Sequence, residues 1–386
     1  MNAQAQMIWP DASSDEWNDW RWQMRNRVRD LRVLSRYLGR NLSQGGLEGI
    51  VRAWPMAITP HTVSHILELE GNGQHDSAAG VLKTYAPDLR ELDIQKTIEI
   101  RKEGMGAAYR YPNCPAAIRQ LYADRVIVMA TFQCPAQCRH CFRRNDPGRN
   151  RDISSQDLQE AVQYIGQWNA SNPDKPIREV IISGGDPLCL SDHKLRKLLE
   201  AVKNTGAVEV VRIDTKFPMA LPQRITPELV EILAQHVHLV CLHAVHAGEI
   251  SPETVEACRK LTQAGIILRS YTPLLRGIND SRETLKELFW QLYRNCRTMP
   301  YYLVHCIETH GAQHLKTPLE QGIEIMQGLR VELSGVCVPK YICYLPQGGG
   351  KAELGPDTKY TRTDDGYWLR SPITGETAPY PDPVKK

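Results

Sequence analysis

Three closely spaced cysteines are the residues best suited to do chemistry in this chain. Cys134, Cys138 and Cys141 follow the pattern C-x3-C-x2-C, directly after a β-rich run at 125–130. Three thiolates from one loop can bind three irons of a [4Fe–4S] cluster and leave the fourth iron open to another ligand. A closed zinc site needs four ligands, and no nearby cysteine or histidine at the required spacing completes one. A ferredoxin motif would supply a fourth cysteine, which does not follow here. The spacing therefore predicts a cluster with one open iron.

The composition is that of an ordinary globular protein. The 386 residues include 47 basic and 44 acidic side chains, a formal charge of +3, with 42% hydrophobic and 24% charged residues. These values exclude a disordered or collagen-like chain and give no reason to expect a nucleic-acid partner. No apolar run approaches the ~20 residues that span a bilayer, and the first residues lack the features of a secretion signal. We therefore expect a cytoplasmic protein without a membrane partner, whose other cysteines lie mostly in its core.

Alternating β-rich and helical segments organise the middle of the chain. The β-rich runs lie at 125–130, 179–182, 208–213, 238–242, 265–270 and 301–305. Segments with helical periodicity lie at 155–168, 193–204, 227–236, 252–264 and 282–294. This alternation predicts βαβ units around a parallel sheet, and six units predict an α/β fold of the partial (β/α)6 barrel type. In such folds the functional groups lie at the carboxyl ends of the strands.

Three segments follow from this pattern. Residues 1–115 are rich in helix formers and are predicted to be a helical N-terminal extension. Residues 116–317 would form the barrel. Residues 318–386 would contain a helix near 319–329, a lysine that follows three glycines, and a polar tail. We expect the tail to be extended and to lie against the barrel mouth or a neighbouring subunit.

A second motif accompanies the cysteines. The second predicted strand is followed by a glycine-containing loop, Ser183, Gly184, Gly185 and Asp186. With the C-x3-C-x2-C loop after the first strand, this region resembles the radical S-adenosylmethionine (SAM) superfamily. The resemblance implies that the open iron binds SAM, whose reductive cleavage gives a radical that abstracts hydrogen from unactivated C–H bonds. It also implies that the glycine loop contacts the SAM amino group and that His140 is a cofactor contact or lies just behind one.

Further motifs narrow the resemblance. In chain order they are Trp17–Gln23, Cys138–Arg144, Leu221–Pro227, Leu275–Asp280 and Gly348–Lys351. Together they resemble the lysine 2,3-aminomutase family over nearly the whole chain. The resemblance implies an isomerase dependent on pyridoxal 5′-phosphate (PLP) that moves the α-amino group of a free amino acid to its β-carbon. Lys351 would hold PLP, Arg143 would bind the substrate carboxylate, and Tyr122 and Arg125 would contact PLP. The family further implies a flavodoxin- or ferredoxin-type electron donor and a homo-oligomer.

The sequence departs from the family around the substrate side chain. Lysine-specific members use two aspartates for the distal ammonium, and the same offsets here give Ile307 and Tyr344. Tyr271 stands where the family has glutamine, and Leu121 stands where it has an arginine that Arg119 could replace. A buried ammonium without a carboxylate would be costly by several kcal/mol. Lysine is therefore a poor substrate candidate.

Several alternatives stay open on the sequence. Arginine is favoured as the substrate, with its guanidinium on Tyr344 or Tyr271 and paired with Glu308. An apolar or aromatic amino acid could fill the same pocket, and lysine or a protein-bound lysine is a weaker candidate. Two alternatives belong to other functional classes: a radical SAM enzyme that does not use PLP, and a non-enzymatic protein that binds a [4Fe–4S] cluster.

Overall fold

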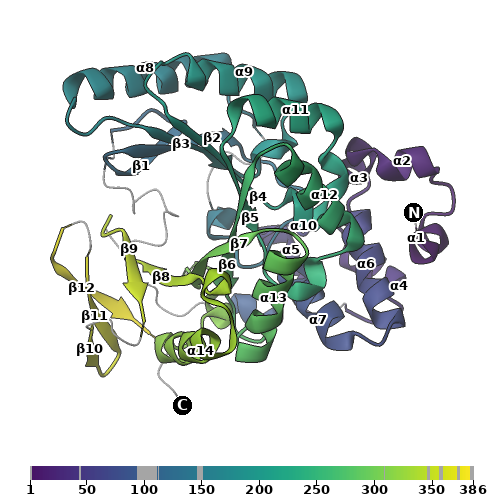
Figure 1. The fold of residues 1–386 in the computed structure, drawn as a ribbon. Coiled ribbons are helices and arrows are strands. Elements are labelled where there is room, and N and C mark those ends of the chain that lie inside the picture. The colour runs from purple at the N-terminus through teal and green to yellow at the C-terminus, as the bar shows by residue number, and fades with distance from the viewer. Residues whose placement is uncertain are drawn as a thin grey trace.

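A curved central sheet with helices on its outer face forms the body of the protein (Figure 1). The computed structural model describes residues 2–42, 45–93, 111, 113–145, 151–307, 309–345, 348–355, 360–371 and 374–382. The N-terminal helices form a separate group beside the sheet, and the last strands lie near its other side (Figure 1). Within these described ranges, no helix is long and apolar enough to cross a membrane.

The central sheet has nine strands that are neighbours in chain order. They are β1 (Ile118–Tyr122), β2 (Arg125–Thr131), β3 (Glu179–Gly184), β4 (Val210–Thr215), β5 (Leu239–His243), β6 (Ile267–Leu274), β7 (Met299–His305), β8 (Lys340–Tyr344) and β9 (Lys351–Leu354). Strands β2 to β8 are parallel, whereas β1 and β9 pair antiparallel at the two edges. Val180, Ile181 and Ile182 of β3 are all buried, as expected for a strand covered on both faces. The predicted α/β fold with a parallel, partly open barrel is confirmed.

The helices between the strands match the periodic segments of the sequence. They are α8 (Ser155–Ser171), α9 (Asp192–Lys203), α11 (Pro227–His236), α12 (Pro252–Gln263), α13 (Arg282–Arg294) and α14 (Leu319–Glu332). Side chains of Ser154, Ser191, Thr226, Ser251 and Ser281 cap the first five of these helices by accepting backbone N–H bonds. In α9, the four apolar residues with helical spacing are buried against the sheet: Leu195, Leu198, Leu199 and Val202.

The N-terminal extension is helical where the structure describes it. It contains α1 (Ala3–Ile8), α2 (Ser14–Asn18), α3 (Trp20–Arg25), α4 (Leu31–Tyr37), α5 (Leu47–Ala53), α6 (Pro60–Gly71), α7 (His75–Tyr85) and the 3-10 helix η1 (Leu89–Leu92). Helices α4 to α7 share a hydrophobic core of their own, which also takes in Ala136 and Ala220 of the barrel, whereas Trp20 of α3 packs into the barrel core. The predicted boundary near residue 115 follows residues 94–110, which lie outside the described ranges.

The C-terminal segment contributes strands to two sheets. Its first strands, β8 and β9, belong to the central sheet, so the sheet extends beyond residue 317. In the tail, β10 (Tyr360–Thr363), β11 (Gly366–Arg370) and β12 (Thr377–Pro381) form a second, antiparallel sheet. Lys316 Nζ donates to the Pro381 carbonyl at 2.6 Å and Leu319 N donates to the Asp382 carboxylate at 2.8 Å. These bonds attach the small sheet to the start of α14.

Helix α14 offers a matched pair of glycines that tests its packing on β8. A Cβ at Gly322 would overlap with the ring of Tyr341, which is buried, whereas a Cβ at Gly328 would meet only the flexible side chain of Arg282. We expect Gly322→Ala to lower the free energy of unfolding by about 1–3 kcal/mol through overpacking. Gly328→Ala should raise it by about 0.5–1 kcal/mol, because alanine favours the helix. Chemical denaturation measures both, and equal effects of the two changes would contradict the packing.

Candidate active site

One cavity inside the curved sheet, from the starts of the parallel strands to the loops after their carboxyl ends, is lined by most of the predicted site residues. Its volume is about 850 Å³. The predicted residues that line it are Tyr122, Arg125, Cys134, Cys138, His140, Cys141, Arg143, Ser183, Gly184, Gly185, Asp186, Ile307, Tyr344 and Lys351. Glu308, the remaining predicted residue, lies outside the described residues. Motifs more than 200 residues apart in the chain therefore meet at a single site.

The three cysteines lie on an irregular loop between β2 and η4 (Phe142–Asn145). Burial raises the pKa of the Cys138 thiol to about 12 and that of Cys134 well above its usual value. A buried thiolate therefore needs a cation beside it, which iron provides. Among the described residues, no three His, Cys, Asp or Glu side chains converge as ligands of a single metal ion. A cluster does not require that, because each cysteine binds a different iron.

A buried carboxylate from the N-terminal extension holds the cysteine loop. Glu91 of η1 is fully buried and accepts two bonds from Arg139, at 2.8 and 2.5 Å, and one from Arg144 at 2.5 Å. Arg139 lies between Cys138 and Cys141, and Arg144 also donates to the carbonyls of Arg139 and Gly311. Both ends of the Cys138–Arg144 turn are thereby tied to one charge, away from the cavity.

The glycine loop packs tightly against the strand that leads into the cysteines. Gly185 N donates to the Thr131 carbonyl at 2.5 Å and Asp186 N donates to the Gln133 carbonyl at 2.7 Å. A Cβ at Gly184 or Gly185 would overlap with this backbone, and Gly184 has a φ of 125°. The glycines are thus required for close approach. The Asp186 carboxylate accepts bonds from Thr215 Oγ1 at 2.8 Å and Lys216 N at 2.7 Å, so it also fixes the end of β4.

Lys351 lies at the first position of β9, where the two edges of the sheet approach each other. Gly348 and Gly350 have φ values of 71° and 83°, which lead the chain into this position. The backbone N–H of Lys351 donates to the hydroxyl of Tyr122, from β1, at 3.1 Å. Burial and the charge of Arg212 lower the pKa of the Lys351 ammonium to about 8. A lysine with this pKa supplies a neutral amine near physiological pH, as condensation with a carbonyl requires.

Neighbouring arginines face different parts of the site. Arg143 lines the cavity. The next residue, Arg144, is buried on the other side of the loop, where it donates to Glu91. The Arg125 guanidinium lies 4.3 Å from the ring centroid of Tyr122. Arg119 and Leu121 both line the cavity as well. Arg119 is therefore in place to supply the positive charge that Leu121 does not.

The part of the cavity around Ile307 and Tyr344 is apolar and aromatic. The Tyr271 and Tyr344 hydroxyls form a hydrogen bond of 2.8 Å, and the His243 ring stacks on Tyr271 with centroids 5.3 Å apart. Burial lowers the pKa of His243 to about 4, so its imidazole is neutral. Pro273 and Leu275 complete this surface.

The described carboxylates that line the cavity are each held by a donor. Glu179 and Asp214 pair with Arg212, at 3.4 and 2.8 Å, and Glu353 pairs with Lys340 at 2.8 Å. Asp186 is held by β4, as described above. A cationic substrate side chain would thus need to share one of these carboxylates with its present partner or use Glu308.

Sequence reasoning missed several residues of this site. Arg212 and Asp214 are two apart on β4, so their side chains project from the same face into the cavity. The alternation of these two charged residues with apolar Val211 and Ile213 could have predicted their place in the site from the sequence. Lys216, just after the same strand, also lines the cavity. Glu91 carried no such signal, because its role depends on a tertiary contact.

The comparisons with known proteins agree with this geometry. Residues 128–289 match the Radical SAM superfamily, so the fold and the cysteine loop define a radical SAM enzyme. The chain is 35% identical to L-lysine 2,3-aminomutase of Clostridium subterminale, over 98% of this chain and 87% of that protein. It is 34% identical to L-lysine 2,3-aminomutase of Fusobacterium nucleatum, over 97% and 85%. It is 31% identical to glutamate 2,3-aminomutase of Clostridioides difficile, over 94% and 82%. The chain belongs to the lysine 2,3-aminomutase family of isomerases, which implies a [4Fe–4S] cluster, SAM and PLP as cofactors.

The buried Glu91 predicts a large effect of a small change. Glu91→Gln removes the charge that pairs with two buried guanidinium groups, so we expect a loss of about 3–5 kcal/mol in the free energy of unfolding. Iron content after anaerobic reconstitution should fall with it, since the loop loses its anchor. Glu256→Gln is the matched control, because Glu256 pairs with Arg259 on the exposed face of α12 and its loss should leave both quantities unchanged. Equal behaviour of the two variants would contradict the anchoring role.

Proposed function

We propose that this protein is a PLP-dependent radical SAM 2,3-aminomutase that moves the α-amino group of a free L-amino acid to the β-carbon. One observation carries the proposal: Lys351, with a pKa lowered to about 8, lines the same cavity as the three cysteines. Schiff-base formation with PLP uses such a lysine directly. When bound, SAM supplies the hydrogen-abstracting radical and PLP supplies the conjugated system that lets nitrogen migrate.

The residues of the cavity have separable tasks in this proposal. Cys134, Cys138 and Cys141 hold three irons, and the glycine loop with His140 borders the open one. Arg143 binds the substrate carboxylate, for which the fork of the guanidinium is suited. Lys351 Nζ holds PLP, and Arg125 with Arg119 supplies positive charge for its phosphate. Burial in the cavity wall keeps water from the reacting groups.

Arginine is the first substrate candidate. The Lys351 ammonium lies 4.8 Å from the ring centroid of Tyr302 and 5.6 Å from that of Tyr344, so this part of the cavity has aromatic faces at cation–π distance from a positive charge. A planar guanidinium stacks on such faces better than an ammonium does. The candidate also requires a carboxylate, which we assign to Glu308.

An uncharged amino acid is the second candidate. The observation that favours it is that the described carboxylates of the cavity already have donors. Ile307, Leu275 and Pro273 would then pack against an apolar or aromatic side chain. Free lysine fits neither arrangement.

The reaction also requires partners outside the chain. Reductive cleavage of SAM needs a one-electron donor, for which a flavodoxin or ferredoxin is suited. None of the eleven cysteines forms a disulfide, in keeping with a reducing, cytoplasmic compartment. A homo-oligomer is the assembly that the family resemblance favours.

The pKa of Lys351 gives a pH prediction. Because its pKa is lowered from 10.5 to about 8, the reactive neutral amine should be half populated near pH 8. The rate of PLP loading onto the enzyme should therefore rise with pH and level off above about pH 8. The visible absorbance band of lysine-bound PLP measures the rate, and Lys351→Ala should show no band. A rate that keeps rising to pH 10 would contradict the lowered pKa.

The substrate pocket gives a second prediction. An anaerobic assay of the reconstituted enzyme against the proteinogenic amino acids, scored for β-amino isomers, should show lysine at least ~100-fold below the best substrate in kcat/KM. The factor corresponds to a lost buried ion pair of ~3 kcal/mol or more. Ile307→Asp combined with Tyr344→Asp should raise activity on lysine and lower it on the best substrate. The matched control is Ile307→Asn with Tyr344→Asn, which adds polarity without charge. Lysine as the best wild-type substrate would contradict the pocket assignment.

A further inference from the structure

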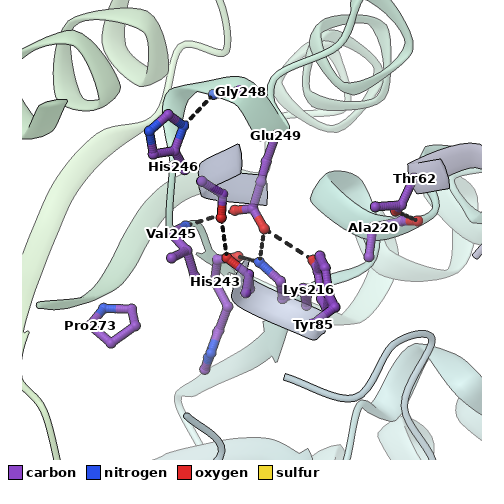
Figure 2. Close-up of polar contacts among 12 residues, drawn as sticks. Thr62, Tyr85, Lys216, Ala220, His243, Val245, His246, Gly248, Glu249 and Pro273 are labelled. Carbon is purple, nitrogen blue, oxygen red and sulfur yellow. Dashed lines mark hydrogen bonds and ion pairs between the residues drawn. The ribbon is translucent and has the colours of Figure 1, made fainter. Parts of the chain in front are cut away.

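A buried polar chain of Tyr85, Glu249 and Lys216 links the N-terminal extension to the end of β4 (Figure 2). Lys216 follows β4 and lines the cavity, and its Nζ donates to Glu249 Oε1 at 2.6 Å and to the His243 carbonyl at 3.1 Å. Glu249 lies in the 3-10 helix η7 (Ala247–Glu249), and its carboxylate also accepts from the Tyr85 hydroxyl at 3.0 Å and from Val245 N at 2.7 Å. Tyr85 is the last residue of α7.

The chain is sealed from solvent. Tyr85 is 0% exposed, Glu249 is 2% exposed and Lys216 is 8% exposed. A buried ammonium is stable only when it is paired and hydrogen-bonded, and Glu249 supplies the pairing charge. Two of the three Nζ protons are used by Glu249 and His243. The ammonium therefore has a fixed position at the wall of the cavity.

The cysteine loop lies within reach of this charge. Lys216 lines the same cavity as the three cysteines. The backbone N–H of Arg139, next to Cys138, donates to the carbonyl of Thr84, next to Tyr85, at 2.9 Å. An iron–sulfur cluster with three thiolates is anionic, and so is the carboxylate of SAM. Lys216 thus places a cation where the site collects negative charge.

The N-terminal extension also binds the two short helices next to the Lys216 ammonium, which are the helix Phe217–Ala220 and η7. Thr59 and Thr62 of the α6 start donate to the Ala220 carbonyl, at 2.6 and 3.2 Å, at the end of the short helix that follows Lys216. His65 of α6 contacts the Gly248 carbonyl at 2.9 Å, next to Glu249. Figure 2 shows Thr62 and Ala220 on one side of the chain and Gly248 on the other.

We propose that Tyr85 and Glu249 are positioning residues that hold the Lys216 ammonium beside the cluster loop, so that the N-terminal extension is part of the SAM-binding machinery. Tyr85 does not touch the cavity contents itself. It restricts the Glu249 carboxylate, and the carboxylate restricts Lys216. The inference does not depend on which amino acid is the substrate or on PLP.

The test measures SAM binding without an amino acid or PLP, so its failure is distinct from failure of the proposed function. The reconstituted full chain is reduced and titrated with SAM, and the change in the electron paramagnetic resonance signal of the cluster reports binding. Tyr85→Phe removes one donor to Glu249 and should raise the dissociation constant of SAM about three- to tenfold. Iron content should equal that of the wild type, because Tyr85 does not line the cavity and the change removes only its hydroxyl.

Tyr341→Phe is the matched control. Tyr341 is also buried, and its hydroxyl makes a 2.7 Å contact with His305 Nδ1 outside the cavity. Its change in melting temperature should resemble that of Tyr85→Phe, whereas its SAM affinity should change less than about twofold. In a Lys216→Met background, Tyr85→Phe should have no further effect on SAM affinity, because it acts through the lysine. Equal SAM affinities of Tyr85→Phe and Tyr341→Phe, or loss of iron in Tyr85→Phe, would overturn the proposal.

Discussion

The buried ion cluster of Glu91, Arg139 and Arg144 is the interaction on which the site depends. The cysteine loop has no regular secondary structure, so backbone hydrogen bonds within it cannot place three thiols. Two arginines on either side of Cys141, Arg139 and Arg144, instead share the carboxylate of Glu91 from the N-terminal extension. Burial of unpaired guanidinium groups would cost several kcal/mol, so the loop has one arrangement of low energy. In that arrangement Arg144 is buried away from the cavity, and Arg143 lies in the cavity wall.

Closure of the curved sheet is the second constraint. The parallel strands bring the cysteine loop and the glycine loop to one end of the sheet. The antiparallel edge strands β1 and β9 approach each other where Tyr122, beside the start of β2, meets Lys351, beside the end of β8. The hydrogen bond from Lys351 to Tyr122 joins those edges. The cysteines and Lys351 therefore share one cavity although they come from opposite ends of the barrel sequence. A site that combines a cluster with a second cofactor needs this arrangement.

Much of the fold was predictable from the sequence, because local patterns determine it. The six β-rich runs became β2 to β7, and the helical segments became α8, α9, α11, α12 and α13 with boundaries shifted by a few residues. The second sheet of the tail was not predicted, since its short strands β10 to β12 are stabilised by contacts such as the one between Lys316 and Pro381. Cysteine spacing and the glycine motif predicted residues that line one cavity. Glu91, Tyr85 and Glu249 could not be predicted, because each acts only through residues distant in the chain.

The central claim is that one cavity performs an intramolecular shift of nitrogen. The most direct measurement gives the reconstituted enzyme, SAM, PLP and a reductant a mixture of amino acids labelled with ¹⁵N at the α-position, in the presence of unlabelled ammonia. Mass spectrometry then detects any β-amino isomer and its label. The account predicts one β-amino acid that keeps the full ¹⁵N content and disappears in Lys351→Ala. Cleavage of SAM without any β-amino product, or a product that has lost its label, would contradict it.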